Sequence, residues 1–469
     1  MFMQSSDLLT GLPKPFEVSA ADVASSVPPE VVYVVLDDDP TGTQSVAGLP
    51  VLTRWSPDDF SWALQQGTAA VYVLTNTRSL DAEQTVSRTR AVVAAATEAA
   101  AKAGRVVRFV SRGDSTLRGH YPLETDILSQ AMLDGGGVAP SFTVLIPAFP
   151  DAGRITVHGV HYWVVGDEAT PVGQTPFAAD ATFGFTSSSL ADWVAEKTGG
   201  RIAADQVVLI DIETVRKGPD AVAAVLREAP AGSVVAPDVV AEDDMRVIAL
   251  AIHALEAEGR SALLRIGPPY LRAHIGQPVA EPVLPDQIEF AHDRGGLVVV
   301  GSHVPLTTAQ LAHLKAARPD TVTIELNARL LLTDERNAHL DDRVRASVDS
   351  IAHATVIVHT SRELIKGRDE AHSLDIARQI SSALVDFVAR LMDAAPPRFV
   401  VAKGGITSSD TASEALGISR AMVVGPMLPG IVSLWQPQSG PAQGIPYVVF
   451  AGNVGEEDSL TAVVARLAD

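Results

Sequence analysis

The chain contains no cysteine, and only 5% of its 469 residues are aromatic. The lack of cysteine excludes disulfides, thiolate metal sites and a cysteine nucleophile. No apolar run approaches the roughly 18 residues that cross a bilayer, and residues 1–18 lack the basic and apolar segments of a secretory signal. We therefore expect a cytoplasmic protein without a membrane partner.

Basic residues are also scarce. The 36 Lys and Arg residues face 56 Asp and Glu residues, which gives a net charge of -20. Such a field repels phosphate backbones, so we do not expect nucleic acid as a partner. An anionic substrate must instead meet a local cluster of Arg and His residues.

Several familiar nucleotide and hydrolase motifs are missing. The chain has no Gly-Lys pair for a P-loop, and GxGxxG, HExxH and GxSxG do not occur. Their absence argues against dinucleotide-binding dehydrogenases, zinc proteases and hydrolases with a nucleophile elbow.

Short runs of apolar and β-branched residues recur along the chain, each followed by a loop and a helical pattern. Runs that are apolar throughout are typical of parallel strands covered on both faces. With this length, they predict an α/β protein of two domains, each with a largely parallel sheet flanked by helices, and an active site in the interdomain cleft. The expected strands are 31–36, 71–75, 106–110, 143–147 and 207–211, then 297–301, 322–326, 355–360, 398–403 and 447–452.

Turn and cap residues divide these elements. Proline-rich residues 279–296 predict a linker between domains 1–278 and 297–469. Ser79 and Gly104 are expected to cap the two ends of an alanine-rich helix between the second and third strands.

The first candidate site is the segment DDDPTGTQ at 37–44, directly after a predicted strand. Ligands of open parallel sheets gather at the carboxyl ends of the strands. Adjacent carboxylates repel each other, so the run favours a bound cation or a hydroxyl-bearing ligand. A solvated acidic turn with an Asp cap before Pro40 is the alternative.

The second candidate is SRGDSTLRGHYPLE at 111–124, also after a strand. Arg side chains bind carboxylates through two parallel hydrogen bonds, which predicts a seat for an acid. The alternative is a surface loop whose arginines pair with local carboxylates. Its candidate residues are Arg112, Asp114, Ser115, Arg118 and His120, and Arg78 in TNTRSL joins them.

A third stretch, residues 147–163, holds Arg154, His158 and His161 after another strand. Two histidines three residues apart could bind a metal. The third ligand and the supporting residues of a metal site are not evident, so we favour a structural or substrate-contacting histidine.

In the C-terminal half, three strand-to-loop junctions are rich in small residues: 301–310, 403–417 and 451–458. Glycines at strand ends let a phosphate approach the backbone, and free amides at helix starts bind it. Each junction has a structural alternative. Thr307 with Gln310 fits a capping box, Ser408 or Ser409 fits an N-cap, and Gly455 fits a turn.

Taken together, these segments resemble the four-carbon acid sugar kinase family over most of the chain. The family's Asp-Asp-Phe-Thr-Gly-Ala signature is similar to residues 38–43, and its Asp-Ser-Thr-Leu-Arg-Gly signature is intact at 114–119. The resemblance implies a sugar-acid domain followed by a nucleotide domain. By resemblance Asp38, Arg78, Asp114 and Arg118 would face the sugar acid. The candidates from the motifs that we add to this substrate site are Asp39, Thr41, Arg112, Ser115, His120 and Arg154.

For the nucleotide, the resemblance implies contacts from Ser302, Gly404, Gly405, Thr407, Gly452, Asn453 and Gly455. The chain departs from the family's pattern at Pro40, at Ile406 and at Phe450-Ala451, where Lys-Ser often stands. Lys403, just before the glycine pair, could replace that lysine at the phosphates.

The implied reaction is phosphoryl transfer from ATP with Mg²⁺ to a hydroxyl of threonate, erythronate or a 3-oxo-tetronate. Arg118 and Arg78 would bind the carboxylate, and either Asp38 or Asp114 would accept the proton. We expect domain closure around both ligands, and a homodimer is possible. Glu456, Glu457 and Asp458 favour a helix start and could also help to hold magnesium. The rivals are a non-catalytic sugar-acid sensor and an oxidoreductase or aldolase with the same anion-binding loops.

Overall fold

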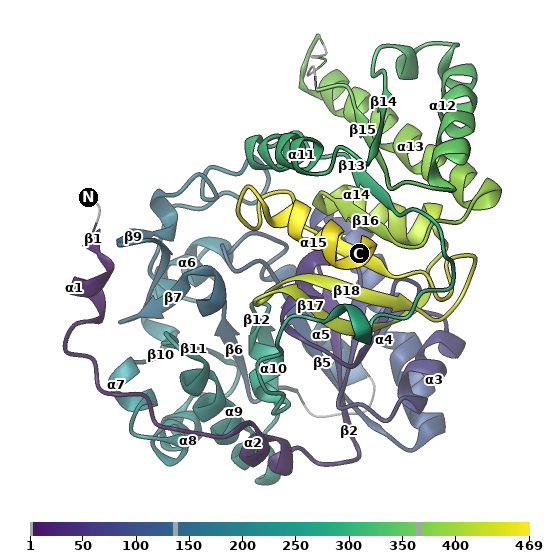
Figure 1. Ribbon diagram of the computed structural model, residues 1–469. Helices are drawn as coiled ribbons and strands as arrows, with labels where there is room; N and C mark the ends of the chain where they lie inside the picture. Colours follow the sequence, from purple (N-terminus) through teal and green to yellow (C-terminus); the bar gives the residue numbers. More distant parts are fainter. Residues whose placement is uncertain (1–2, 135–138, 363–364, 366–367) are drawn as a thin grey trace. The chain divides into compact units, whose positions relative to one another are not determined.

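The computed structural model of the protein describes residues 3–134, 139–362, 365 and 368–469. The chain divides into two compact units (Figure 1). The first runs to Val46 and continues from Trp55 to Val279, and the second consists of Ala47–Arg54 and Ala280–Asp469. The division predicted from sequence, with domains 1–278 and 297–469 joined by a linker at 279–296, stays a prediction.

The core of the first unit is a parallel sheet with the strand order β10-β11-β6-β12-β5-β2-β4. β2 and β4 are buried along their whole length, which explains why their sequences do not alternate between apolar and polar residues. The strands are β2 (Val31–Asp37), β4 (Ala70–Leu74), β5 (Val106–Arg112), β6 (Phe142–Ile146), β10 (Val208–Ile210), β11 (Ser233–Pro237) and β12 (Ala262–Ile266).

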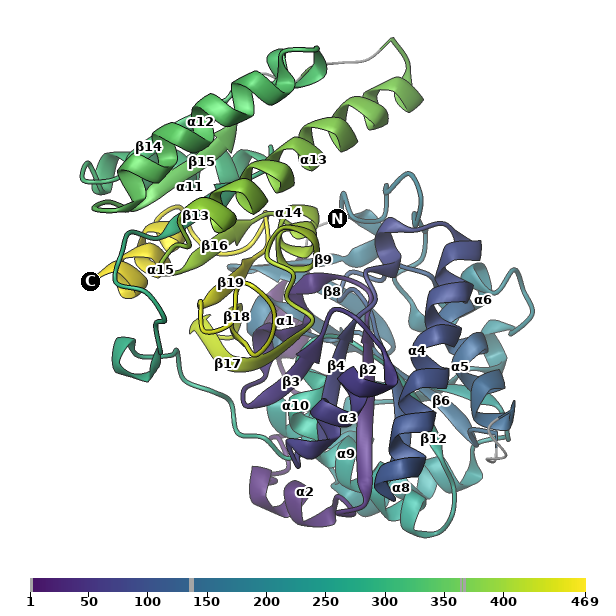
Figure 2. The ribbon, with the colours of Figure 1, turned by 90° about the vertical axis from the view of Figure 1, so that its right-hand side faces the viewer.

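Helices pack around this sheet in two neighbouring groups. One group has α4 (Ala82–Ala103) between α3 (Pro57–Gln65) and α5 (Leu123–Asp134), and Figure 2 shows these side by side. In the other, α9 (Glu242–Ala257) contacts its neighbours α2 (Ala20–Ser26), α7 (Ile212–Val215), α8 (Pro219–Glu228) and α10 (Tyr270–His274). The unit also contains α1 (Ser5–Leu9) and α6 (Leu190–Lys197).

The helix predicted between the second and third strands is α4. Its end at Gly104 is confirmed, because this residue has the left-handed φ of 64° that glycine tolerates best. The predicted cap at Ser79 was wrong. Asp81 caps the helix and forms a capping box with Gln84, whereas Ser79 ends the short turn η2 (Thr77–Ser79).

A small antiparallel sheet, which the sequence did not predict, follows β6. Its strand order is β1-β9-β8-β7, and its register places Arg154 opposite Trp163. The strands are β1 (Met3–Gln4), β7 (Arg154–Val157), β8 (Val160–Val165) and β9 (Glu168–Pro171).

The second unit contains a mixed sheet with the order β3-β17-β18-β19-β16-β13-β15-β14. From β19 to β14 all neighbours are parallel, while β3, β17 and β18 are antiparallel. The predicted α/β class with two largely parallel sheets is therefore confirmed. The strands are β3 (Leu49–Leu52), β13 (Leu297–Val300), β14 (Val322–Leu326), β15 (Val356–Thr360), β16 (Val400–Lys403), β17 (Arg420–Leu428), β18 (Ile431–Pro437) and β19 (Tyr447–Phe450).

In this unit α12 (Arg336–Ile351) packs along α13 (Glu370–Ala394), and α11 (Pro305–Ala317) packs against α15 (Ser459–Ala468). The short helix α14 (Gly405–Asp410) follows β16 directly. Apolar residues of β13, β16, β19, α11 and α15 form one buried core.

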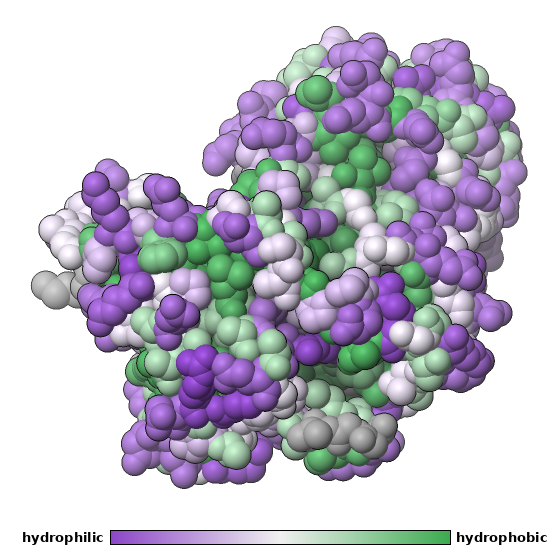
Figure 3. Space-filling model, turned by 90° about the horizontal axis from the view of Figure 1, so that it is seen from below, coloured by the Kyte–Doolittle hydropathy of each residue, from purple (hydrophilic) through white to green (hydrophobic). Residues whose placement is uncertain are grey.

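Within the described ranges, no helix is both long and apolar enough to cross a membrane. Figure 3 shows one face of the molecule, on which hydrophilic and hydrophobic residues are mixed. Exposed large apolar residues such as Leu9, Val106 and Leu284 are separated along the chain.

A buried histidine pair joins α9 to α10. The Nε2 atoms of His253 and His274 lie 3.3 Å apart, and Ser26 Oγ lies 2.7 Å from His253 Nδ1. Burial, aided by the charge of Arg108, lowers the pKa of His253 to about 4, and burial also lowers the pKa of His274. The pair is therefore neutral in the folded protein at neutral pH.

This pair predicts acid sensitivity. The unfolded chain binds protons at histidine near pH 6.5, but folded His253 binds one only near pH 4, so its contribution to stability is lost as the pH falls from 6.5 toward 4. Urea unfolding at pH 7 and pH 5 should show this loss, on the order of 2 kcal/mol per histidine. It should be smaller in His253→Gln than in the exposed control His353→Gln. Equal losses in both variants would contradict this account.

Candidate functional site

The end of β2 places three consecutive aspartates at the carboxyl edge of the first sheet. Asp37 and Asp38 are buried, and Asp39 is half-buried. The Asp37 carbonyl accepts hydrogen bonds from the Thr75 backbone and hydroxyl at 2.9 and 2.8 Å, and the Asp38 carbonyl accepts one from the Arg78 amide at 3.2 Å. The loop after β4 is thereby fixed beside the three carboxylates.

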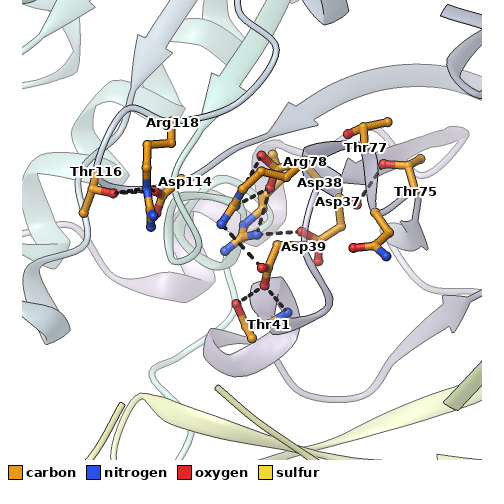
Figure 4. A network of polar contacts seen from close by, with 12 residues as sticks. Asp37, Asp38, Asp39, Thr41, Thr75, Thr77, Arg78, Asp114, Thr116 and Arg118 are labelled. Carbon is orange, nitrogen blue, oxygen red and sulfur yellow. Dashed lines mark hydrogen bonds and ion pairs between the residues drawn. The ribbon is translucent and has the colours of Figure 1, made fainter. Parts of the chain in front are cut away.

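Two arginines bind these carboxylates (Figure 4). Arg78 donates to both oxygens of Asp38, at 2.6 and 3.2 Å, and its Nη1 reaches Asp39 at 3.4 Å. Arg112 donates from Nη1 to Asp37 at 2.7 Å and to Asp38 at 3.4 Å. Burial of so many like charges is tolerated because each carboxylate has a cationic partner.

The turn after β2 closes over this cluster. Asp39 accepts hydrogen bonds from the Thr41 amide at 2.9 Å and the Thr41 hydroxyl at 2.5 Å, so the predicted Asp cap before Pro40 is present as well. A Cβ at Gly42 would lie 2.0 Å from Asp37 Oδ2. Glycine is therefore needed there for the turn to pass the carboxylate.

The neighbouring carboxyls differ in acidity. Burial raises the pKa of Asp37 to about 7, and Asp38 and Asp39 add to the rise although Arg112 opposes it. For Asp39, burial is outweighed by Arg78, Arg112 and Thr41, which hold its pKa below the usual value. Proton uptake by the cluster near neutral pH would thus occur at Asp37.

The loop after β5 presents a second ion pair. Arg118 Nε donates to Asp114 Oδ2 at 2.6 Å, and the Thr116 hydroxyl donates to the same oxygen. Asp114 Oδ1 accepts no hydrogen bond from the described residues. Although burial acts in the opposite direction, Arg78 and Arg118 hold the pKa of Asp114 below its usual value. The Asp114 side chain is 12% exposed, compared with 1% for Asp38.

The remaining predicted substrate residues have other local roles. Ser115 is buried, and its carbonyl lies 2.8 Å from His161 Nε2. His120 Nε2 lies 2.9 Å from the Leu80 carbonyl. Arg154 contacts no carboxylate of the described chain within 4 Å.

The two histidines after β6 do not form a metal pair. His161 is buried between Thr156 and Ser115, and burial lowers its pKa to about 4. His158 is exposed beside Glu213. Among the described residues no group of three His, Asp or Glu is placed to hold a metal ion. The contacts of His161 with Thr156 and the Ser115 carbonyl are those of a structural histidine.

Sequence reasoning missed Arg265 on β12. Its Nη1 donates to Ser111 Oγ at 2.6 Å and to Glu124 Oε2 at 2.5 Å, and Glu124 also accepts from Thr77 Oγ1 at 2.6 Å. A Cβ at Gly113 would lie 2.4 Å from the Arg265 guanidinium. The loop that carries Asp114 therefore wraps around this arginine, and Gly113 was the only sequence signal for it.

In the second unit, the three glycine-rich loops converge. A Cβ at Gly301 would lie 2.1 Å from Thr407 Oγ1, and one at Gly452 would lie 2.7 Å from Ser302 Oγ. Gly404 has a φ of 130°, and a Cβ there would lie 3.2 Å from Ser302 Cβ. The ends of β13, β16 and β19 thus come together around the small side chains of Ser302 and Thr407, which leave no room for a side chain at the glycines.

The structural alternatives offered for these loops need correction. Thr307 and Gln310 do not form a capping box, because α11 has Val304 at its N-cap. α14 starts after Gly404, so neither Ser408 nor Ser409 is its cap, and Ser408 Oγ donates to the Ala402 carbonyl at 2.7 Å. The glycine turn at Gly455, with a φ of 86°, is confirmed.

Buried side chains donate hydrogen bonds to the backbone carbonyls of the third glycine-rich loop, residues 451–458. Thr307 donates to Gly452 at 2.8 Å, and Gln310 donates to Val454 at 3.1 Å and Glu456 at 2.7 Å. Lys403 Nζ donates to Ala451 at 2.6 Å. Among the described residues the amides of Gly452, Asn453 and Gly455 have no protein acceptor, while Val454 closes the turn over residues 452–453, so three amides of this loop are left as donors for an anion.

Lys403 is fully buried beneath this loop. It lies opposite Phe450 in the register of β16 and β19, and its ammonium is 3.8 Å from the centre of that ring. Burial lowers the pKa of Lys403 to about 7. These contacts make Lys403 a support for the loop that carries the free amides.

The second unit therefore fits a nucleotide phosphate, since glycines and unpaired amides line its converging loops. No protein cage for magnesium is found among the described residues. In nucleotide-dependent enzymes magnesium is often held by substrate phosphates and water, with few protein ligands.

Comparison with known proteins assigns both halves of the chain. A sugar-binding N-terminal domain family matches residues 33–274, and a nucleotide-binding C-terminal domain family matches residues 297–460. The chain belongs to the four-carbon acid sugar kinase family.

Relatives in this family cover nearly the whole chain. The D-threonate kinase of Bordetella bronchiseptica is 30% identical, over 91% of this chain and 95% of the relative. The 3-oxo-tetronate kinase of Methylobacterium radiotolerans is 26% identical, over 90% and 96%. A crystal structure from Haemophilus influenzae, 18% identical and covering 92% of this chain and 99% of its own, has the same fold with a TM-score of 0.62.

The position of Lys403 predicts a measurable effect on this kinase-family nucleotide unit. Lys403→Met keeps the packing on Phe450 but removes the hydrogen bonds to Ala451 and Val454. Because one charged hydrogen bond contributes about 1.5–3 kcal/mol, we expect ADP to bind about tenfold more weakly by calorimetry. The exposed control Lys102→Met should bind ADP normally. Unchanged ADP affinity in Lys403→Met would contradict a supporting role.

Proposed function

We propose that the protein is an ATP-dependent kinase that phosphorylates a hydroxyl of a four-carbon acid sugar such as D-threonate, D-erythronate or a 3-oxo-tetronate. The observation that carries the proposal is the similarity to the D-threonate kinase along 91% of the chain. The site geometry supports it. One unit offers an arginine and carboxylate cluster for a hydroxy acid, and the other offers an amide-lined loop for phosphate.

ATP is the proposed donor, and the loops around Ser302, Gly404 and Gly452 would hold its phosphates. Gly405, Thr407, Asn453 and Gly455 belong to the same proposed site. Bound magnesium would neutralise charge on the phosphate oxygens, and we assign no protein step to it. In-line phosphoryl transfer requires the acceptor hydroxyl to lie next to the terminal phosphate of the donor. Closure of the two domains around both ligands, which would bring these groups together, stays a prediction.

We assign the general base to Asp114. Both oxygens of Asp38 are already hydrogen bonded to Arg78, whereas Asp114 Oδ1 is open to accept the hydroxyl proton. Arg118 and Thr116 fix the opposite oxygen and so orient the open one. The low pKa of Asp114 keeps it ionised, and a weak base suffices for a transition state in which the hydroxyl loses its proton late.

Asp38 then has an organising role. Together with Asp39 it holds Arg78, and with Asp37 it holds Arg112. Thr41, Ser115 and His120 shape the same proposed substrate site through their loop contacts. A sugar-acid sensor would share this organisation, and turnover distinguishes it from an enzyme.

A coupled assay of ADP release tests the proposed reaction directly. With ATP and magnesium we expect turnover with at least one of D-threonate, D-erythronate and the 3-oxo-tetronates, and none with pentonates. ADP binding without turnover on any acid would favour the sensor. Failure to bind ADP would contradict the proposed use of ATP.

The assignment of the base predicts different effects for two aspartates. Asp114→Asn should lower kcat by about 10²- to 10⁴-fold, the usual contribution of a general base, with little change in the KM for ATP. Asp38→Asn should mainly reduce thermal stability, because Arg78 and Arg112 lose a buried counter-charge. Near wild-type turnover of Asp114→Asn would rule out Asp114 as the base.

A further inference from the structure

The small sheet after β6 and the turn that follows β9 bring an arginine and two aromatic residues close to the ion pair of Arg118 and Asp114. Arg154 begins β7, directly opposite Trp163 on β8, and its guanidinium carbon lies 5.9 Å from the centre of the indole ring. Trp163 meets Phe177 edge to face, with ring centres 5.2 Å apart. Phe177 in turn lies 5.1 Å from the guanidinium carbon of Arg118.

Trp163 and Phe177 therefore form an aromatic pair that supports two guanidinium groups. Cations lie favourably against ring faces at these distances, and a planar guanidinium loses little further freedom when it is stacked. Both rings are only half-buried, so a ligand can approach the side chains that they support. The aromatic pair links Arg154 to the ion pair of Arg118 and Asp114.

Arg154 differs from its neighbours in one respect. Arg78, Arg112 and Arg118 each bind a carboxylate of the protein. Arg154 makes no ion pair with any described residue. Its Nη1 donates to the Ala152 carbonyl at 2.5 Å, and its buried Nε has no hydrogen-bond partner.

The electrostatics favour an anionic ligand at this position. Burial lowers the pKa of Arg154, Arg118 acts in the same direction, and the charge of Asp114 opposes both without restoring the usual value. A buried cation without a counter-ion is unfavourable, and a ligand carboxylate can satisfy two N–H groups of one guanidinium at once. Arg78 is less available for this task, because its N–H groups already bind Asp38 and Asp39.

We propose that Arg154 is the residue that selects an acid substrate by binding its carboxylate, and that Trp163 and Phe177 position it. The ligand class is a short hydroxy or oxo carboxylate. The part of this proposal that concerns turnover rests on the proposed kinase activity. Carboxylate binding by Arg154 does not.

The test compares D-threonate and D-erythronate with D-threitol, which keeps the hydroxyls but lacks the carboxylate. Binding is measured by calorimetry and turnover by ADP release, in wild type, Arg154→Met, Arg154→Lys and the exposed control Arg227→Met. For Arg154→Met we expect about a hundredfold rise in the Kd and KM of the acid. We expect a kcat within a few-fold of wild type, unchanged ADP binding, and an unchanged response to threitol.

Two further variants separate recognition from folding. Arg154→Lys keeps the charge but loses the planar donor pair, and should recover part of the acid affinity. Trp163→Leu should weaken acid binding about tenfold without affecting ADP. Thermal unfolding identifies any variant that fails to fold, and Arg154→Lys then provides the decisive comparison.

The outcomes distinguish this inference from the proposed function. Wild-type turnover on an acid with unchanged acid affinity in Arg154→Met and Arg154→Lys would overturn the inference and leave the kinase intact. Equal losses for acid and threitol would also overturn it. Acid binding that depends on Arg154 without ADP release would support the inference and contradict the kinase. No acid binding by wild type would contradict both.

Discussion

The ion network at the end of β2 is the constraint on which the first unit depends. Asp37 and Asp38 lie in the interior at the end of a fully buried strand, where an unpaired carboxylate would be costly. Arg112 and Arg78 satisfy them, and the loops after β4 and β5 must then run where these arginines can reach. Gly42, Gly113 and Gly119 are required for the same reason, because a side chain at each would collide with an aspartate or with Arg265.

The two units offer different kinds of groups to a ligand, side-chain charges in the first and backbone amides in the second. The first collects side-chain charges and leaves a few of them unsatisfied, notably Asp114 Oδ1 and the Arg154 guanidinium. The second unit has glycine-rich loops in which backbone amides are left as donors, while Thr307, Gln310 and Lys403 donate to the carbonyls of the loop at 451–458. This division suits the proposed transfer of a phosphoryl group from ATP to a hydroxyl of a small acid with release of ADP, since charges orient the acid and amides hold the phosphates.

The sequence predicted most of the buried parallel strands from their uninterrupted apolar runs, but it did not predict β11 and β12, which are buried as well. It also did not predict β7, β8 and β9 or the antiparallel β17 and β18. Their sequences mix polar and apolar residues, and β8, β9 and β17 are only partly buried. The loops of the candidate site were found from their place after strands. Their pairings were not, since Arg78 and Asp38 are 40 residues apart, and Arg265 lies on β12, a strand that was not predicted. Thr307 and Gln310 fit a local capping pattern but bind a loop that lies more than 140 residues away.

The strand β3 gives the chain an unusual connectivity. Its segment, Ala47–Arg54, belongs to the second unit although the chain on both sides of it belongs to the first, and it pairs with β17. A fragment that begins after the linker would lack this strand and leave the edge of β17 without its partner, the kind of exposed edge that promotes aggregation. Neither unit is therefore one continuous stretch of sequence, and a nucleotide unit expressed alone would need residues 47–54 supplied separately to complete its sheet.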